Sequence, residues 1–78
     1  MDLLDLKALE RENDQLFSEI RRIQIDEMIK KSNFQDAFIL LVTTSAKLNG
    51  NKVEKNNLII YYHDFIRDFI FNNLKYKL

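Results

Sequence analysis

The residues best suited to acid–base chemistry are His63 and two nearby carboxylates, Asp64 and Asp68. A helix would place Asp64 and Asp68 on one face, because i,i+4 neighbours share a face, and the only histidine lies beside them. Such a group can transfer protons, as general acid–base catalysts do. Arg67, however, follows Asp64 at the i,i+3 spacing and can pair with it. A catalytic site also needs a pocket, so we interpret this group as a solvated charged strip.

Hydroxyl residues that could act as nucleophiles have no evident base partner. They are Ser32, Thr43, Thr44 and Ser45. The sequence also lacks a glycine-rich phosphate loop and the ligand spacing of a metal site. The absence of cysteine excludes thiolate zinc sites, and one histidine is too few for a histidine-based site. We therefore predict that the chain is not an enzyme and uses no cofactor and no metal.

The length and charge of the chain favour a small domain that needs a partner. Its 78 residues form one domain, 1–78, and a domain of this size buries only about 60% of its chain surface. Disulfides are excluded, so association with another chain is the remaining way to add buried surface. Twelve basic and twelve acidic residues cancel. This neutral balance permits self-association and disfavours nucleic acid as the partner.

The amino-terminal residues and the hydropathy indicate a soluble, cytoplasmic protein. The chain begins Met1-Asp2-Leu3-Leu4-Asp5, with acids where a signal peptide carries Lys or Arg. No apolar run approaches the roughly 18 residues that span a bilayer, so we expect no membrane association. Ile, Asn, Lys, Phe and Tyr supply 34 of the 78 residues. That composition is typical of low-GC genomes and of the phages, plasmids and viruses associated with them.

The scarcity of helix breakers predicts an all-α fold. Gly50 is the only glycine, and proline is absent, so little interrupts the apolar periodicity. We predict three helices, at about 2–31, 33–49 and 53–76. Together they would form a small three-helix unit, one helix plus a helical hairpin, assembled into a homodimeric bundle.

Capping signals mark the expected helix ends. Ser32 with Gln35, and Asn51 with Glu54, match capping boxes at the starts of the second and third helices. Gly50 is expected to provide the left-handed residue that ends the second helix.

An α+β alternative remains open at this stage. Segments 38–44 and 58–62 are rich in strand-forming residues, and an Asn49-Gly50 pair lies between them. The connection is much longer than a two-residue turn, and the flanking caps favour helices.

Two of the expected helices have a second apolar face. In the first helix, one seam follows heptad spacing through Leu6, Leu9, Asn13, Leu16, Ile20 and Ile23. Other apolar residues of this helix lie on nearly the opposite side or between the two. In the third helix, Ile60 and Phe71 stand within an otherwise polar side. We predict that a partner or a second copy covers Phe17, Ile25, Met28, Ile29, Ile60 and Phe71. A bundle with a central third helix is the simpler alternative.

Asn13 interrupts the heptad seam of the first helix. A single Asn at such a position can set register and oligomer state in a parallel coiled coil. We therefore expect a non-enzymatic interaction protein that self-associates as a homodimer and binds another protein.

The alternative is a small DNA-binding regulator built on the 34–75 hairpin. Its reading helix would begin with polar and basic residues, namely Lys52, Lys55, Asn56 and Asn57.

Overall fold

The computed structural model describes the backbone of residues 3–77 and the side chains of residues 12–75. The described residues form α1 (Leu3–Lys30), α2 (Phe34–Lys47), α3 (Lys52–Tyr61) and α4 (His63–Lys77). No strand occurs within residues 3–77, so the all-α prediction is confirmed and the α+β alternative is wrong. Segment 38–44 lies inside α2, and segment 58–62 forms the end of α3 and its junction with α4.

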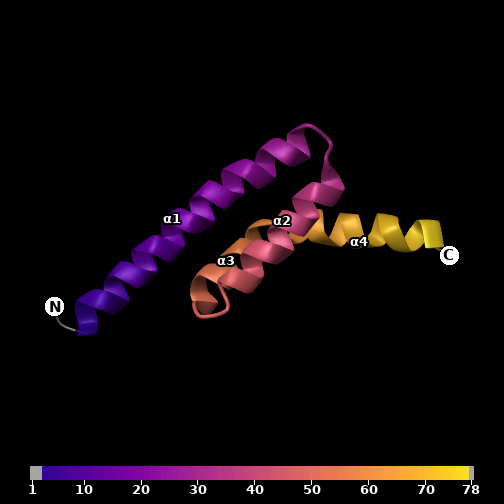
Figure 1. Ribbon diagram of the computed structural model, residues 1–78. Coiled ribbons are helices and arrows are strands. Elements are labelled where there is room, and N and C mark those ends of the chain that lie inside the picture. Colours follow the sequence, from indigo (N-terminus) through magenta and orange to yellow (C-terminus); the bar gives the residue numbers. More distant parts are fainter. Residues whose placement is uncertain (1–2, 78) are drawn as a thin grey trace.

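The longest element, α1, packs against the α2–α3 hairpin through only part of its length (Figure 1). It has 28 residues against 14 in α2, which corresponds to about 42 Å of helix at 1.5 Å per residue. Its amino-terminal part therefore extends past the turn between α2 and α3 (Figure 1). At the other end, α4 packs against α2 and projects away from α1, giving an elongated molecule of 55 × 23 × 15 Å.

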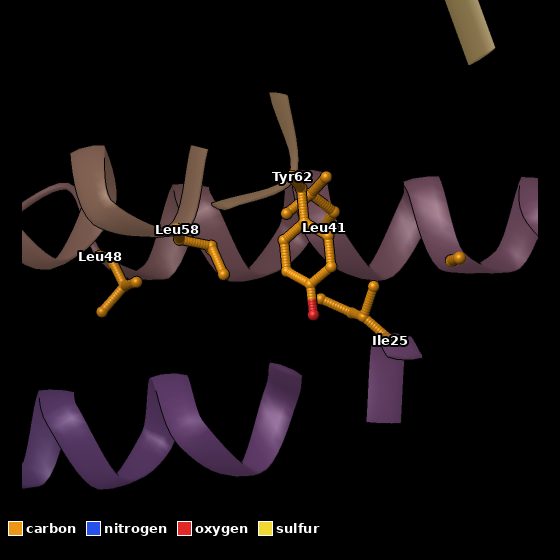
Figure 2. Packing of buried hydrophobic residues seen from close by; sticks show 6 residues of the cluster. Ile25, Leu41, Leu48, Leu58 and Tyr62 are labelled. Atoms are coloured by element: carbon orange, nitrogen blue, oxygen red, sulfur yellow. The ribbon is translucent and has the colours of Figure 1, made fainter. Parts of the chain in front are cut away.

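A small apolar core lies where α1, α2 and α3 meet. Its fully or almost fully buried side chains are Ile25, Ala37, Leu41, Leu48, Leu58 and Tyr62 (Figure 2). Complete burial of one large aliphatic side chain contributes about 1.5–3 kcal/mol, so these few residues supply much of the favourable free energy of folding. Thr44 is also buried, and its hydroxyl donates a hydrogen bond to the Leu40 carbonyl oxygen at 2.6 Å.

The turn between α1 and α2 is a Schellman motif with Ser32 in its left-handed position, at φ 64°. The Asn33 N–H donates to the Met28 carbonyl at 2.8 Å, and the Ser32 N–H donates to the Ile29 carbonyl at 3.0 Å. These two hydrogen bonds define the motif. Ser32 therefore ends α1, and the predicted capping box of Ser32 with Gln35 is wrong. The N-cap of α2 is Asn33, whose side chain makes no capping hydrogen bond.

The turn between α2 and α3 confirms the capping role of Asn51 and corrects that of Gly50. Asn51 Oδ1 accepts a hydrogen bond from the Glu54 N–H at 3.2 Å, while Asn51 Nδ2 donates to Asp14 Oδ2 at 3.1 Å. Asn51 therefore both starts α3 and ties the hairpin turn to α1. Gly50 does not have positive φ, so the left-handed residue predicted at this turn is absent.

The expected third helix is divided at Tyr62. This residue is non-helical, with φ −103° and ψ 18°, and it separates α3 from α4. Helix kinks usually occur at proline, at glycine or serine, or where a group inserts into the hydrogen-bond ladder, but no proline or glycine is present here. The break instead coincides with the residue whose side chain spans the core to reach α1. It also redirects the chain, so that α4 leaves the hairpin.

Candidate interaction surfaces

The outer face of α1 carries a line of exposed aliphatic side chains, Leu16, Ile20 and Ile23, which we call the α1 stripe. Their exposed fractions are 57%, 55% and 68%. Spacings of four and three residues place them on one helical face. Ile25, which is fully buried, lies about 180° around the helix from Leu16 at about 100° per residue. The α1 stripe therefore faces away from α2 and α3.

The inner face of α1 contains four residues that the sequence predicts to contact a partner, namely Phe17, Ile25, Met28 and Ile29. Ile25 is part of the core, and Met28, Ile29 and Phe17 are half-buried against it. The assignment of Ile25 to an outer interface is therefore wrong. Periodicity reveals two apolar faces on this helix, but both contain aliphatic side chains of similar size. It could not show that Leu16, Ile20 and Ile23 would be the exposed set.

Asn13 is exposed and precedes Leu16 by one helical step on the line of the α1 stripe. The predicted role of Asn13 in setting coiled-coil register remains a prediction. Leu6 and Leu9, which continue the seam in the sequence, have side chains outside the described residues.

The outer side of α3 and α4 leaves Ile60 and Phe71 exposed, at 70% and 66%. The prediction that a partner or a second copy covers these two side chains remains a prediction. Phe71 has exposed apolar neighbours in Ile70 and Leu74, near the outer end of α4. A helix that is apolar around much of its circumference is normally covered. The projecting end of α4 is thus an uncovered surface.

An aromatic groove of about 550 Å³ lies along α2 and α4, and we call it the α2–α4 groove. It is lined by Phe34, Phe65, Asp68, Phe69, Asn72 and Asn73. The Phe34 and Phe65 ring centroids are 6.4 Å apart, and those of Phe65 and Phe69 are 6.0 Å apart. Phe69 also stacks on Phe38 at 4.4 Å. The sequence could not predict this groove, because it forms only where α4 packs against α2 and leaves the Phe34 ring half exposed.

Tyr62 connects the α3–α4 junction to α1. Its hydroxyl donates to Asp26 Oδ1 at 2.7 Å and lies 3.0 Å from the Arg22 carbonyl oxygen. Burial raises the pKa of Tyr62 above its ordinary value of 10.0, and the hydrogen bond to Asp26 raises it further. Both effects disfavour the phenolate, so Tyr62 acts as a neutral anchor. The Arg22 guanidinium lies over the Tyr61 ring, 5.6 Å from its centroid.

The acid–base candidates form an exposed strip along the start of α4. Asp64 lies 3.6 Å from His63 and 3.7 Å from Arg67, and Asp68 lies 3.5 Å from Arg67. All four side chains are largely exposed, and Asp68 also lines the α2–α4 groove. The hydroxyls of Thr43 and Thr44 donate to backbone carbonyls of α2. Within the described part of the chain, no three His, Asp or Glu side chains gather as metal ligands would.

Comparisons with protein families, with curated proteins and with solved structures found no match. Among residues 3–77, none of the helices is both long and apolar enough to cross a membrane.

Proposed function

We propose that this chain is a non-enzymatic helical interaction protein, which self-associates and binds another protein. The observation that carries the proposal is the gathering of large exposed apolar side chains into separate surfaces. One surface is the α1 stripe, another is the outer end of α4 with Ile70, Phe71 and Leu74, and a third is the α2–α4 groove on the other side of α4. Single exposed apolar residues are ordinary, but contiguous ones usually mark an interaction surface.

The α1 stripe and the α2–α4 groove suit different partners. The α1 stripe is a straight line of aliphatic side chains at coiled-coil spacing, which suits another helix of the same kind. The α2–α4 groove instead combines an aromatic floor with a polar rim, formed by Asp68, Asn72 and Asn73. Interfaces typically combine a buried aromatic anchor with hydrogen-bonding groups at the rim. This groove therefore fits an apolar side chain of a different protein.

The alternative of a DNA-binding regulator receives less support from the geometry. The first turn of α3 contains Lys52 and Lys55, but Glu54 and the exposed Val53 lie between them. Lys55 Nζ also donates a hydrogen bond to Asn49 Oδ1 at 2.6 Å. Phosphate binding normally requires a continuous basic surface. Gel shifts at two salt concentrations would detect such binding, because it should weaken steeply with salt.

Light scattering of the full chain over a range of micromolar concentrations tests self-association. We expect a mass above that of the 9.4 kDa monomer. For the second part, the full chain is used as bait. Phe34→Asp tests the α2–α4 groove, Phe71→Asp tests the outer end of α4, and Asn57→Asp, an exposed polar position on α3, is the control. A specific partner should bind the wild type and the control but lose binding to one of the two test variants. A monomer at all concentrations, together with no partner sensitive to Phe34 or Phe71, would overturn the proposal.

A further inference from the structure

We propose that the α1 stripe is the self-association surface, and that two copies of α1 pair along it in parallel, with Asn13 facing its counterpart. This inference rests on the proposed function, because it specifies where and how the chain self-associates.

The spacing of the stripe matches the seam of a two-helix coiled coil. Asn13, Leu16, Ile20 and Ile23 follow one another at steps of three, four and three, which are the a and d positions of a heptad. A β-branched residue at a, here Ile20, with leucine at d, here Leu16, favours two strands, although Ile23 at d departs from that rule. The exposed side chains of the α1 stripe thus have the spacing needed to pack against one further helix.

The hairpin does not block such pairing. Ile25, on the inner face, is opposite the stripe, so α2 and α3 would lie on the outside of the paired helices. The hydrogen bond between Asp14 and Asn51 places the α2–α3 turn near the middle of α1, and the helix continues beyond it to Leu3 (Figure 1). A second α1 can therefore approach along the whole described stripe.

Charges beside the stripe favour the parallel orientation. One flank contains Glu12 and Glu19 at heptad spacing, followed by Asp26, whose carboxylate accepts the Tyr62 hydrogen bond. The other flank contains no acid over the same length, and its residues are Phe17, Gln24 and Lys31. In an antiparallel pair, equal flanks meet, so acid would face acid. In a parallel pair, each acidic flank meets the flank without acids, which avoids the repulsion.

Asn13 favours the same orientation. In a parallel pair aligned in register, Asn13 meets Asn13 of the other copy, and the two amides can hydrogen-bond to each other. In an antiparallel pair aligned on the same four residues, Asn13 would meet Ile23. A buried amide without a partner is destabilising. The flanking charges and the Asn13 amide are separate features of the helix, and both favour the parallel pair.

Disulfide trapping tests the orientation directly, because the native chain contains no cysteine. Under mild oxidation, the full-length Asn13→Cys variant should form a covalent dimer rapidly. Gln15→Cys, an exposed position off the stripe, is the control and should react slowly. A mixture of Asn13→Cys and Ile23→Cys chains should give two homodimers and little mixed product. A predominant mixed disulfide would show an antiparallel pair and would overturn the inference.

A matched pair of substitutions tests the surface. Ile23 and Val53 are both 68% exposed, but Val53 lies on α3, which packs against the opposite face of α1. Ile23→Asp should raise the dimer dissociation constant by at least about tenfold, whereas Val53→Asp should leave it unchanged. Circular dichroism should show native helix content in both variants. If Ile23→Asp still dimerises, pairing along the α1 stripe is wrong, but self-association of the chain is not. If the wild type is monomeric, both proposals are wrong.

Discussion

The Tyr62 hydroxyl donates a hydrogen bond to the Asp26 carboxylate, with 2.7 Å between Tyr62 Oη and Asp26 Oδ1. This bond joins the α3–α4 junction to α1, and the Tyr62 ring lies between them beside Leu41 and Ile25 (Figure 2). The bend between α3 and α4 is located at the same residue. One side chain thus fills the core, anchors the longest helix and marks the point at which α4 departs.

Tyr62→Phe should lower the free energy of unfolding by about 1–2 kcal/mol, because it removes a hydrogen bond to a charged acceptor and leaves the packing unchanged. Urea denaturation followed by circular dichroism measures the loss. Tyr61→Phe is the matched control: Tyr61 is 60% exposed, so its change should stay within about 0.5 kcal/mol. Equal losses in the two variants would contradict the anchoring role of Tyr62.

The raised pKa of Tyr62 predicts a loss of stability in alkali. In the unfolded chain this phenol titrates near its ordinary pKa of 10.0, and folding raises that pKa. The folded state therefore retains the proton at a higher pH, and the contribution to stability is complete below pH 10 and lost as the pH rises above it. Unfolding curves between pH 8 and 11 should show a steeper fall for the wild type than for Tyr62→Phe. Tyr62→Phe lacks this phenol, so parallel curves for the two proteins would refute the prediction.

Asn51→Ala should lower the free energy of unfolding by about 1–2 kcal/mol, because it removes an N-cap hydrogen bond and the link to Asp14. Asn33→Ala is the control at the start of α2, where the N-cap side chain makes no capping hydrogen bond. That variant should lose much less stability. Thermal unfolding of both proteins, measured under the same conditions, gives the comparison, and a larger loss for Asn33→Ala would contradict the capping assignment.

Ser32→Gly should stabilise the protein by up to about 1 kcal/mol, because it relieves the left-handed strain of a residue with a Cβ.

Gly50→Ala should also stabilise the protein, by about 0.4–1 kcal/mol, because the unfolded chain loses conformational freedom. Gly50 lacks positive φ, and its added Cβ would meet nothing within 4 Å. Midpoints of urea unfolding report both changes. A destabilised Gly50→Ala would show that this turn requires glycine after all.

Ile25→Ala and Ile23→Ala should change the free energy of unfolding in different ways, because the two residues lie on opposite faces of α1. Ile25 is fully buried, so its truncation should lower the free energy of unfolding by about 2–5 kcal/mol at any protein concentration. Ile23 contributes to the proposed dimer instead, so the effect of its truncation should fade on dilution, as mass action requires. Denaturation at two protein concentrations distinguishes the variants. A concentration-independent loss for Ile23→Ala equal to that for Ile25→Ala would contradict this assignment.

Local sequence signals predicted much of the helical framework. The absence of proline indicated helices throughout, and Asn51 starts α3 as its capping pattern predicts. In the segment after it, Leu58 and Tyr62 are buried and Phe65 is half-buried, while Ile60 and Phe71 are exposed. These features depend on hydrogen bonds and periodicities that span only a few residues, so the sequence alone is enough to specify them.

Tertiary packing decided the remaining features. Both faces of α1 are apolar, and the inward choice of Ile25 over Ile23 depends on which face fits α2 and α3. Tyr62 divides a continuous helical pattern at the point where its hydroxyl reaches Asp26, which lies 36 positions earlier. The α2–α4 groove exists only because this break redirects α4. The sequence thus determined the helices and their own apolar faces, but only contacts between distant segments determined which faces were buried, because burial depends on shape complementarity across the whole fold.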